Sequence, residues 1–312
     1  MNAEIVIFGG SAHPSLADEI CSHLHVVRSP VEITRFANDC LQAQLLENCR
    51  QQDVYIVQPL VPPTQEHLME LLLMIDAARG ASAAQITVVM PHYAYARSDK
   101  KDAPRISIGG KLVADLLATA GASRLLAMTL HSPQVHGFFG IPVDHLHALR
   151  ELAEHFHRRD LTRAVVLSPD LGYAKSAAAF ARRLGIPVAA GAKERFSDSR
   201  VSISSIIGEV ADRDVIIVDD EIARGTTVIE LLSVLRRQEP RSISVVCTHG
   251  LFADGALEKL AAAEDVSEIV CTNSVPMPVE HPKLTVLSVA PALAEAIRRT
   301  HDGQSVSALF DH

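Results

Sequence analysis

Cysteine is scarce in this chain and occurs in no recognisable pairing. The five cysteines, Cys21, Cys40, Cys49, Cys247 and Cys271, are scattered and odd in number, and the sequence has no C-x-x-C pair. This spacing argues against a disulfide framework and against a zinc site. We therefore expect reduced thiols, as is typical of a cytoplasmic protein.

Long apolar segments and an excess of positive charge are missing as well. The longest apolar stretch, residues 68–75, contains Glu70 and is closed by Asp76, so it is too short to span a bilayer. The N-terminus lacks the basic region and apolar run of a signal peptide. Lysine and arginine number 29 against 37 acidic residues, giving a net charge of −8, which disfavours nucleic acid as a partner. We expect a membrane to be no partner either.

What the chain does contain is a regular alternation of two kinds of segment. With 312 residues, of which 48% are hydrophobic, it is long enough for two domains. Short continuous apolar runs predict strands buried on both faces of a parallel sheet, at residues 4–8, 54–58, 86–90, 124–128, 164–167, 214–218, 243–247 and 268–271. Amphipathic segments predict helices at residues 14–25, 64–79, 108–120, 147–158, 173–184, 228–237, 255–262 and 290–300. The alternation is typical of an α/β fold with right-handed crossovers.

The alternation occurs twice, which predicts two α/β domains of similar size. We place the N-terminal domain at residues 1–145 and the C-terminal domain at residues 146–312. The sequence leaves open which half the last helix packs against. In an open parallel sheet, ligands bind beyond the carboxyl ends of the strands, so the segments that follow the predicted strands are the candidate sites.

The strongest candidate segment follows the predicted strand at 214–218. Asp219 and Asp220 come after four apolar residues, and Arg224-Gly225-Thr226-Thr227 then leads into a helix. Glycine allows close backbone approach, hydroxyls donate, and a helix N-terminus favours an anion. A phosphorylated sugar fits, because the acids can accept bonds from ribose hydroxyls while the turn holds the phosphate. The alternative is a surface turn in which an aspartate caps the helix.

Two more segments carry charged side chains, one suited to Mg²⁺ and the other to phosphates. Asp170 lies between a strand and a helix and could contribute to binding Mg²⁺, which prefers oxygen ligands; the alternative is a proline-containing turn. Arg97, Lys100 and Lys101 form a cationic cluster that could neutralise a triphosphate; the alternative is a solvated loop.

The last candidates are a histidine and a pair of cations. His131 follows a predicted strand, although a lone histidine is more often a satisfied polar residue than a ligand or base. Lys193 and Arg195 are two positions apart, so they face the same side of an extended arm and could clamp a transition state or simply be exposed. Taken together, the segments after the strands predict an anionic nucleotide and a phosphorylated sugar with Mg²⁺ between them.

Motifs along nearly the whole chain resemble those of the ribose-phosphate pyrophosphokinases. Several of them lie outside the general phosphoribosyltransferase signature, which separates this family from its transferase relatives. The motifs are Arg35-Phe36, Glu47-Asn48, Leu68-Met-Glu-Leu71, Tyr95-Ala-Arg97, Leu130-His131, Gln134, Gly137-Phe-Phe139, Pro142-Val-Asp144, Ser168-Pro-Asp170, Val218-Asp-Asp220 and Ala294-Glu-Ala-Ile-Arg-Arg299.

The resemblance implies a fold, a reaction and partners. It implies two phosphoribosyltransferase-like domains, each a mainly parallel sheet flanked by helices. It implies that the anomeric hydroxyl of ribose 5-phosphate attacks the β-phosphorus of Mg-ATP, which gives phosphoribosyl pyrophosphate (PRPP) and AMP. It also implies Mg²⁺ as cofactor, a homo-oligomer that is usually a hexamer built from dimers, and phosphate and ADP as regulators.

The resemblance also implies roles for individual residues, taken position by position. For the nucleotide, these are Phe36 and Asn38 near the adenine, Arg97 and Lys100 at the phosphates, and His131 with Asp170 at the Mg²⁺–nucleotide site. For the sugar, these are Asp219 and Asp220 at the ribose hydroxyls, and Arg224, Gly225, Thr226 and Thr227 at the 5-phosphate. Lys193 and Arg195 match the mobile catalytic arm.

The sequence departs from the family pattern at several of these places. Thr129 stands where an aspartate is usual, Cys40 where a glutamate is usual, and Tyr173 where a second glycine is usual. The sugar-phosphate loop, usually Asp-Thr-Gly-Gly-Thr, here has Ala223 and Arg224 at its start. Arg224 either binds the phosphate and compensates, or occupies the site and blocks it.

These departures leave three hypotheses for the function. The leading one is an active pyrophosphokinase. The second is a catalytically degenerate paralogue that serves as a regulatory subunit of an active enzyme. The third, a phosphoribosyltransferase that uses PRPP as substrate, is disfavoured by the nucleotide-binding motifs of the first half.

Overall fold

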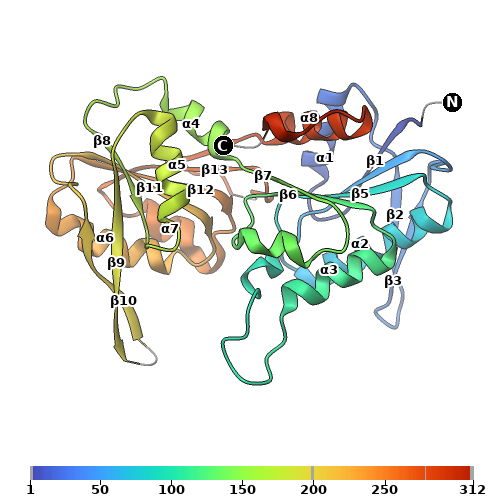
Figure 1. Cartoon of the computed structure of the whole chain (residues 1–312), viewed down its shortest axis with the longest axis horizontal. Coiled ribbons are helices and arrows are strands. Elements are labelled where there is room, and N and C mark those ends of the chain that lie inside the picture. The colour runs from blue at the N-terminus through green and yellow to red at the C-terminus, as the bar shows by residue number, and fades with distance from the viewer. Residues whose placement is uncertain (1–2, 198–199, 278, 310–312) are drawn as a thin grey trace. The chain divides into compact units, whose positions relative to one another are not determined.

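The structure is a computed structural model that describes residues 3–197, 200–277 and 279–309; of residues 193–197, 200–202 and 308 it describes the backbone alone. The chain divides into two compact units. Unit 1 comprises Met1–His147, Ser274–Pro276 and Val289–His312, and unit 2 comprises Ala148–Asn273 and Met277–Ser288. Each is a layered arrangement of a sheet and helices, so the predicted α/β fold is confirmed (Figure 1).

Unit 1 is built on a parallel sheet with helices on both faces (Figure 1). The strands run in the order β1-β4-β5-β6-β7, and all neighbours are parallel. Their bounds are β1 Ile5–Gly9, β4 Asp53–Val57, β5 Gln85–Met90, β6 Arg124–Met128 and β7 Val143–Leu146. One face is covered by α1 (Pro14–Leu24) and α8 (Ala290–His301), the other by α2 (Thr64–Gly80) and α3 (Gly109–Ala120). An antiparallel hairpin of β2 (Val31–Arg35) and β3 (Leu41–Leu45) packs against α2.

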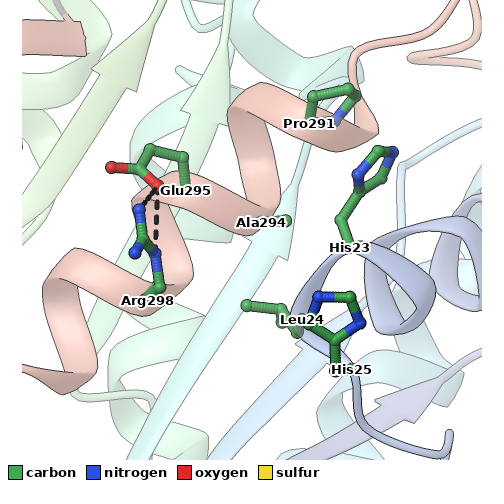
Figure 2. Close-up of a pocket in the computed structure, with 7 residues that line it drawn as sticks. All are labelled: His23, Leu24, His25, Pro291, Ala294, Glu295 and Arg298. Carbon is green, nitrogen blue, oxygen red and sulfur yellow. Dashed lines mark hydrogen bonds and ion pairs between the residues drawn. The ribbon is translucent and has the colours of Figure 1, made fainter.

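The last helix, whose place the sequence left open, belongs to unit 1 and packs on α1. His301 Nδ1 lies 2.7 Å from Asp53 Oδ2, and the buried Tyr55 hydroxyl donates to the Ile297 carbonyl at 3.4 Å. A cavity of about 310 Å³ lies between α8 and the end of α1 and is lined by His23 and His25 from α1 and its end and by Arg298 from α8 (Figure 2). Because α1 runs back from the carboxyl end of β1, this cavity lies toward the amino ends of the strands, away from the candidate site loops.

Unit 2 is built on a second sheet with the order β10-β9-β8-β11-β12-β13-β14. Neighbouring strands are parallel except β9 and β10, which form an antiparallel hairpin. The strand bounds are β8 Ala164–Ser168, β9 Val188–Ser197, β10 Arg200–Ile207, β11 Asp214–Ile222, β12 Ser242–Gly250, β13 Val266–Thr272 and β14 Leu284–Leu287. The helix bounds are α4 Leu149–Phe156, α5 Ala174–Leu184, α6 Thr226–Leu235 and α7 Ala256–Ala261. The apolar side chains of α6 and α7 share one core with those of β11 and β12, with α6 against β10 and α7 against β13. α4 packs on α5 through Phe156 and Phe180.

All five cysteines are free thiols, as the sequence predicted, and only Cys40 is exposed. In the described ranges, no helix combines the length and the apolar character needed to cross a bilayer.

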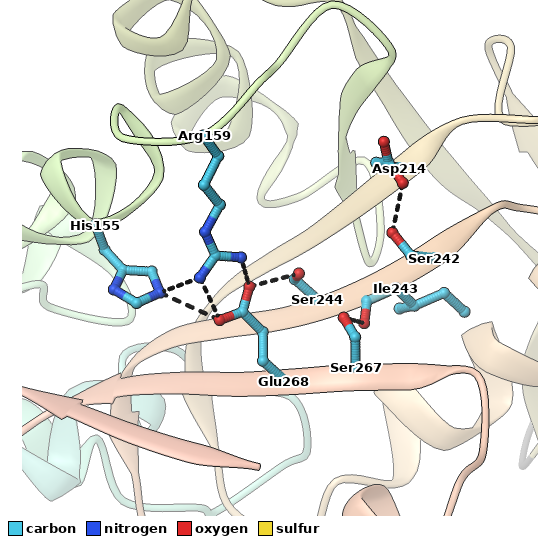
Figure 3. Close-up of polar contacts among 8 residues, drawn as sticks. All are labelled: His155, Arg159, Asp214, Ser242, Ile243, Ser244, Ser267 and Glu268. Atoms are coloured by element: carbon cyan, nitrogen blue, oxygen red, sulfur yellow. Dashed lines mark hydrogen bonds and ion pairs between the residues drawn. The ribbon is translucent and has the colours of Figure 1, made fainter.

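A partly buried carboxylate holds the end of α4 to the sheet of unit 2 (Figure 3). Glu268 of β13 accepts bonds from both terminal nitrogens of Arg159, one of them at 2.8 Å, and from the Ser244 hydroxyl at 2.8 Å. His155 Nε2 lies 3.1 Å from the same carboxylate. Burial alone raises the pKa of Glu268, but the bonds from Arg159, His155 and Ser244 outweigh it, so the pKa is below its ordinary value.

We expect Glu268→Gln to lower the free energy of unfolding by about 1.5–3 kcal/mol at pH 7, because the amide cannot replace these charge-assisted bonds. The folded pKa of Glu268 lies below the unfolded one, so this stability is present above roughly pH 4.3 and is lost as the pH falls through the folded pKa. Urea unfolding should therefore show a smaller difference in the free energy of unfolding between the original protein and Glu268→Gln at pH 4 than at pH 7. The exposed pair of Arg150 and Glu154 gives the matched control, since Glu154→Gln should change stability by less than about 0.5 kcal/mol.

Candidate active site

The two central acids lie within β11 rather than after it. The sequence predicted that the strand ends at residue 218, whereas β11 continues to Ile222 and includes both Asp219 and Asp220. The strand continues because β12 remains its neighbour, with Asp219 opposite Cys247 in the ladder. Asp220 is only 4% exposed, and its backbone N–H donates to Asp219 Oδ1 at 2.9 Å. Both acids are thus held by the sheet and not by a surface turn.

A third carboxylate of unit 2 joins these two. The ends of β8 and β11 lie side by side, with Leu167 paired to Ile217, and Asp170 follows β8. Burial raises the pKa of Asp219 well above its ordinary value; Asp220 raises it further, and Asp170 adds to the effect. Three carboxyl groups therefore share one region at the carboxyl end of the sheet.

Tyr173 lies beside the same acids. Its backbone N–H donates to Asp170 Oδ1 at 3.1 Å, directly before α5 begins. Burial raises the pKa of its phenol well above the ordinary value, and Asp220 and Asp219 raise it further. The phenol therefore stays protonated and can donate a hydrogen bond in the space where the acids lie.

The turn after β11 has the conformation that an anion site at a helix start requires. Gly225 has φ +69°, in the left-handed region that glycine adopts without strain, and α6 begins at Thr226, two residues earlier than predicted. Arg224 and Thr226 are exposed and Thr227 is half-buried. The N-terminus of α6 thus opens toward solvent beside a cation and two hydroxyls.

The pair of cations predicted for the mobile arm lies on β9. Its backbone pairs with β10, with Lys193 opposite Ile203 and Arg195 opposite Val201. The side chains of Lys193 and Arg195 lie outside the described part of the structure. The extended backbone predicted for this arm is present; the roles of the two cations stay predictions.

In unit 1, the residues predicted near the adenine lie in the β2–β3 hairpin. Phe36 is 48% exposed, so it presents a free aromatic face. Asn38 uses its side-chain oxygen to accept the Cys40 N–H at 3.2 Å, which shapes the turn. Arg35 forms one ion pair with Asp39 inside the hairpin and another with Glu66, which joins the hairpin to α2.

The cations predicted for the triphosphate follow β5. Arg97 ends the 3₁₀ helix η1 (Ala94–Arg97) and is exposed. Lys100 is exposed as well, with its ammonium 3.8 Å from Asp102. His131 is exposed after β6, the neighbour of β5. The carboxyl edge of this sheet therefore carries Arg97, Lys100 and His131, whereas Phe36 and Asn38 lie in the separate β2–β3 hairpin.

Sequence reasoning missed one residue that positions the His131 loop. His145 of β7 accepts the Leu130 N–H on Nε2 at 2.8 Å, so this nitrogen carries no proton. The preceding Thr129 has φ +43°, a left-handed conformation that is uncommon for a β-branched residue. His145 of β7 thus holds the loop in a strained conformation. In the sequence, its position was indicated only by the neighbouring motif that ends at Asp144.

Among the described residues, no group of three or more His, Cys, Asp or Glu side chains is arranged to hold a metal ion alone. The carboxylates near Asp219 nevertheless offer the oxygen donors that Mg²⁺ prefers, and their mutual repulsion would be relieved by a cation. The residues fit a Mg²⁺ ion whose remaining ligands come from bound phosphates and water.

Comparisons with known proteins identify the family to which the chain is similar. Residues 5–121 match the N-terminal domain of ribose phosphate pyrophosphokinase, and residues 192–311 match the phosphoribosyl synthetase-associated domain. A provisionally named ribose-phosphate pyrophosphokinase of Streptomyces coelicolor is 69% identical over 99% of this chain and 98% of its own. The ribose-phosphate pyrophosphokinase of Deinococcus radiodurans is 46% identical over 98% of each chain.

A solved structure shows the same fold. The phosphoribosylpyrophosphate synthetase of Mycobacterium smegmatis superposes with a TM-score of 0.90 at 36% identity, over 96% of this chain and 99% of that one. The fold and these relatives define a protein with phosphoribosyltransferase-like α/β domains that is an enzyme of the diphosphokinase class. The chain belongs to the ribose-phosphate pyrophosphokinase family.

Proposed function

We propose that this protein transfers the β,γ-diphosphoryl group of Mg-ATP to the C1 hydroxyl of ribose 5-phosphate and releases AMP. The observation that carries the proposal is the acid pair within β11, followed directly by the Gly225 turn that opens α6. The acids suit a polyhydroxylated sugar and the helix start suits its phosphate. The names of the full-length relatives support the same substrate and product.

In the sugar half, each group has a distinct task. Asp219 and Asp220 accept hydrogen bonds from the ribose hydroxyls, which orients the C1 hydroxyl for attack. The N–H groups of the first turn of α6, with Thr226 and Thr227, hold the 5-phosphate. Arg224 adds a positive charge at the same turn. Positioning of this kind supplies much of the rate enhancement in phosphoryl transfer.

For the nucleotide, the chain supplies an aromatic face and cations. Phe36 and Asn38 contact the adenine, Arg97 and Lys100 contact the polyphosphate, and Lys193 and Arg195 stabilise the charge that develops on the transferred group. Mg²⁺, held by Asp170 and His131 together with the phosphates, would neutralise negative charge on the triphosphate.

A homo-oligomer, a hexamer by family resemblance, is part of the proposal. The supporting observation is that two packed helices of unit 1 expose apolar side chains: Leu112 and Leu116 of α3 are 54% and 39% exposed, and Met69 of α2 is 50% exposed. Side chains of this kind suit contact with another copy better than contact with water.

The test is to incubate the purified protein with Mg²⁺, ATP and ribose 5-phosphate and to measure AMP and PRPP together. We expect both in equal amounts, and we expect Lys193→Ala to lower kcat at least about 100-fold without a comparable loss of thermal stability. If a folded protein releases no AMP at any phosphate concentration, the proposal is wrong and a regulatory paralogue is favoured. A Lys193→Ala effect confined to stability would remove that residue from the catalytic arm.

A further inference from the structure

An ion pair joins the sugar-phosphate turn to the loop after the neighbouring strand. Arg224 Nε lies 2.8 Å from Asp254 Oδ2. Arg224 directly precedes the Gly225 N-cap of α6, and Asp254 lies in the 3₁₀ turn η4 (Ala253–Gly255) between β12 and α7. The cation of the phosphate turn is thus paired with a carboxylate that no motif of the sequence analysis included.

The backbone around Asp254 is held in place by several contacts. The Phe252 N–H donates to the Ile222 carbonyl at 3.0 Å, and Lys259 Nζ donates to the Asp254 carbonyl at 2.7 Å. Asp254 itself has φ +56°, which aspartate and asparagine adopt more readily than most residues. The carboxylate is therefore presented to Arg224 from a constrained loop, while the arginine side chain is the flexible member of the pair.

The pair is too exposed to be a strong structural bond. Arg224 is 74% exposed and Asp254 64% exposed. Exposed pairs of this kind change an equilibrium by a factor of about five at most. A phosphate dianion carries more charge than a carboxylate, can accept two guanidinium bonds, and would also gain the favourable field of the α6 N-terminus. A sugar phosphate bound at this turn therefore competes successfully for Arg224.

We propose that Asp254 is a counter-ion that Arg224 exchanges for the 5-phosphate, so that the pair sets the affinity of the site for phosphorylated sugars. Asp254 neutralises Arg224 in the free protein and releases it when the sugar phosphate binds. The inference rests on the proposed function, because it assigns the phosphate to the turn at Arg224. It identifies Asp254 as a specificity-determining residue that weakens binding of the phosphorylated substrate.

Two substitutions in the full-length protein test this exchange, with ribose 5-phosphate as the probe and calorimetry as the readout. Titrations are made with and without a non-hydrolysable ATP analogue and Mg²⁺. We expect Asp254→Asn to lower the Kd by about two- to five-fold and Arg224→Gln to raise it. In the Arg224→Gln background, Asp254→Asn should leave the Kd unchanged. The gain in affinity from Asp254→Asn alone should be smaller in high salt. Unphosphorylated ribose should bind both single variants as it binds the original protein.

The chain offers a matched control in the pair of Arg163 and Asp212. Arg163 Nη1 lies 2.7 Å from Asp212 Oδ2, and the two side chains are 55% and 78% exposed. Asp212, like Asp254, has a positive φ, of 53°. Asp212→Asn should leave the Kd unchanged.

Three outcomes would overturn the exchange while leaving the proposed function intact. They are an unchanged Kd for Asp254→Asn, an equal gain in both Arg224 backgrounds, and tighter binding by Arg224→Gln, which would mean that Arg224 blocks the site. If the original protein binds no ribose 5-phosphate with the ATP analogue present, the proposed function itself is wrong.

Discussion

Asp219→Asn is expected to lower kcat/KM for ribose 5-phosphate by roughly 10- to 200-fold and, at the same time, to make the free protein more stable at neutral pH. The loss of activity follows because an amide is a weaker acceptor than a carboxylate for the ribose hydroxyls, and bonds to charged groups contribute about 1.5–3 kcal/mol. The gain in stability follows because burial and the neighbouring carboxyls of Asp220 and Asp170 disfavour a charge on Asp219.

The pH dependence of the stability effect has a definite sign. The pKa of Asp219 is higher in the folded protein than in the unfolded chain, so the folded state binds more protons between the two values. Stability is therefore fully present below the unfolded pKa, near 3.9, and falls as the pH rises toward the folded pKa. Thermal unfolding should show the largest gain for Asp219→Asn at pH 7–8, and the gain should vanish near pH 4.

The other end of the same strand supplies the control. Asp214 begins β11 and accepts the Ser242 hydroxyl at 2.6 Å (Figure 3), far along the strand from the acid pair. Asp214→Asn should leave kcat/KM unchanged and should lower stability slightly, because it weakens a bond and relieves no repulsion. A fall in stability for Asp219→Asn at pH 7, or unchanged kinetics, would contradict the assignment of Asp219 as a strained ribose-binding acid.

The sequence predicted those elements whose burial leaves a local signal. Strands such as β8 and β12 are buried along nearly their whole length, so their apolar runs are continuous, and the predicted ends differ from the observed ones by a few residues. β2 is only partly buried, and β7 spans four residues, so neither has such a run, and both were missed. β9 and β10 were not predicted as a hairpin because they carry many polar residues.

In the candidate site, too, only features with a local sequence signal were predicted. Asp219, Asp220 and Gly225 were identified because acids, glycine and hydroxyls follow one another in a single segment. The extension of β11 beyond residue 218 could not be predicted, because it depends on pairing with β12. His145 and Asp254 were missed for a related reason, since each acts on a loop distant in sequence and neither is marked by its own neighbours.

Gly191 of β9 is the position where the smallest added group is expected to have a large effect. A Cβ atom there would lie 2.6 Å from the Pro169 carbonyl oxygen and 3.4 Å from Leu231 Cδ1. The first contact is with backbone, which cannot rotate away, so Gly191→Ala must displace either β9 or the loop that carries Asp170. Overpacking of this kind costs about 1–3 kcal/mol of stability.

The displacement would also move two groups of the candidate active site. β9 continues to Lys193, two residues on, and the Pro169 loop continues directly to Asp170. Because a shift of about 1 Å in a positioning group can lower a rate about 100-fold, we expect kcat of Gly191→Ala to fall by roughly that factor at temperatures where the variant remains folded. Gly140→Ala is the control, since a Cβ at Gly140 meets nothing within 4 Å. A variant that loses thermal stability yet keeps its kcat would show that β9 and the Asp170 loop can move without disturbing catalysis.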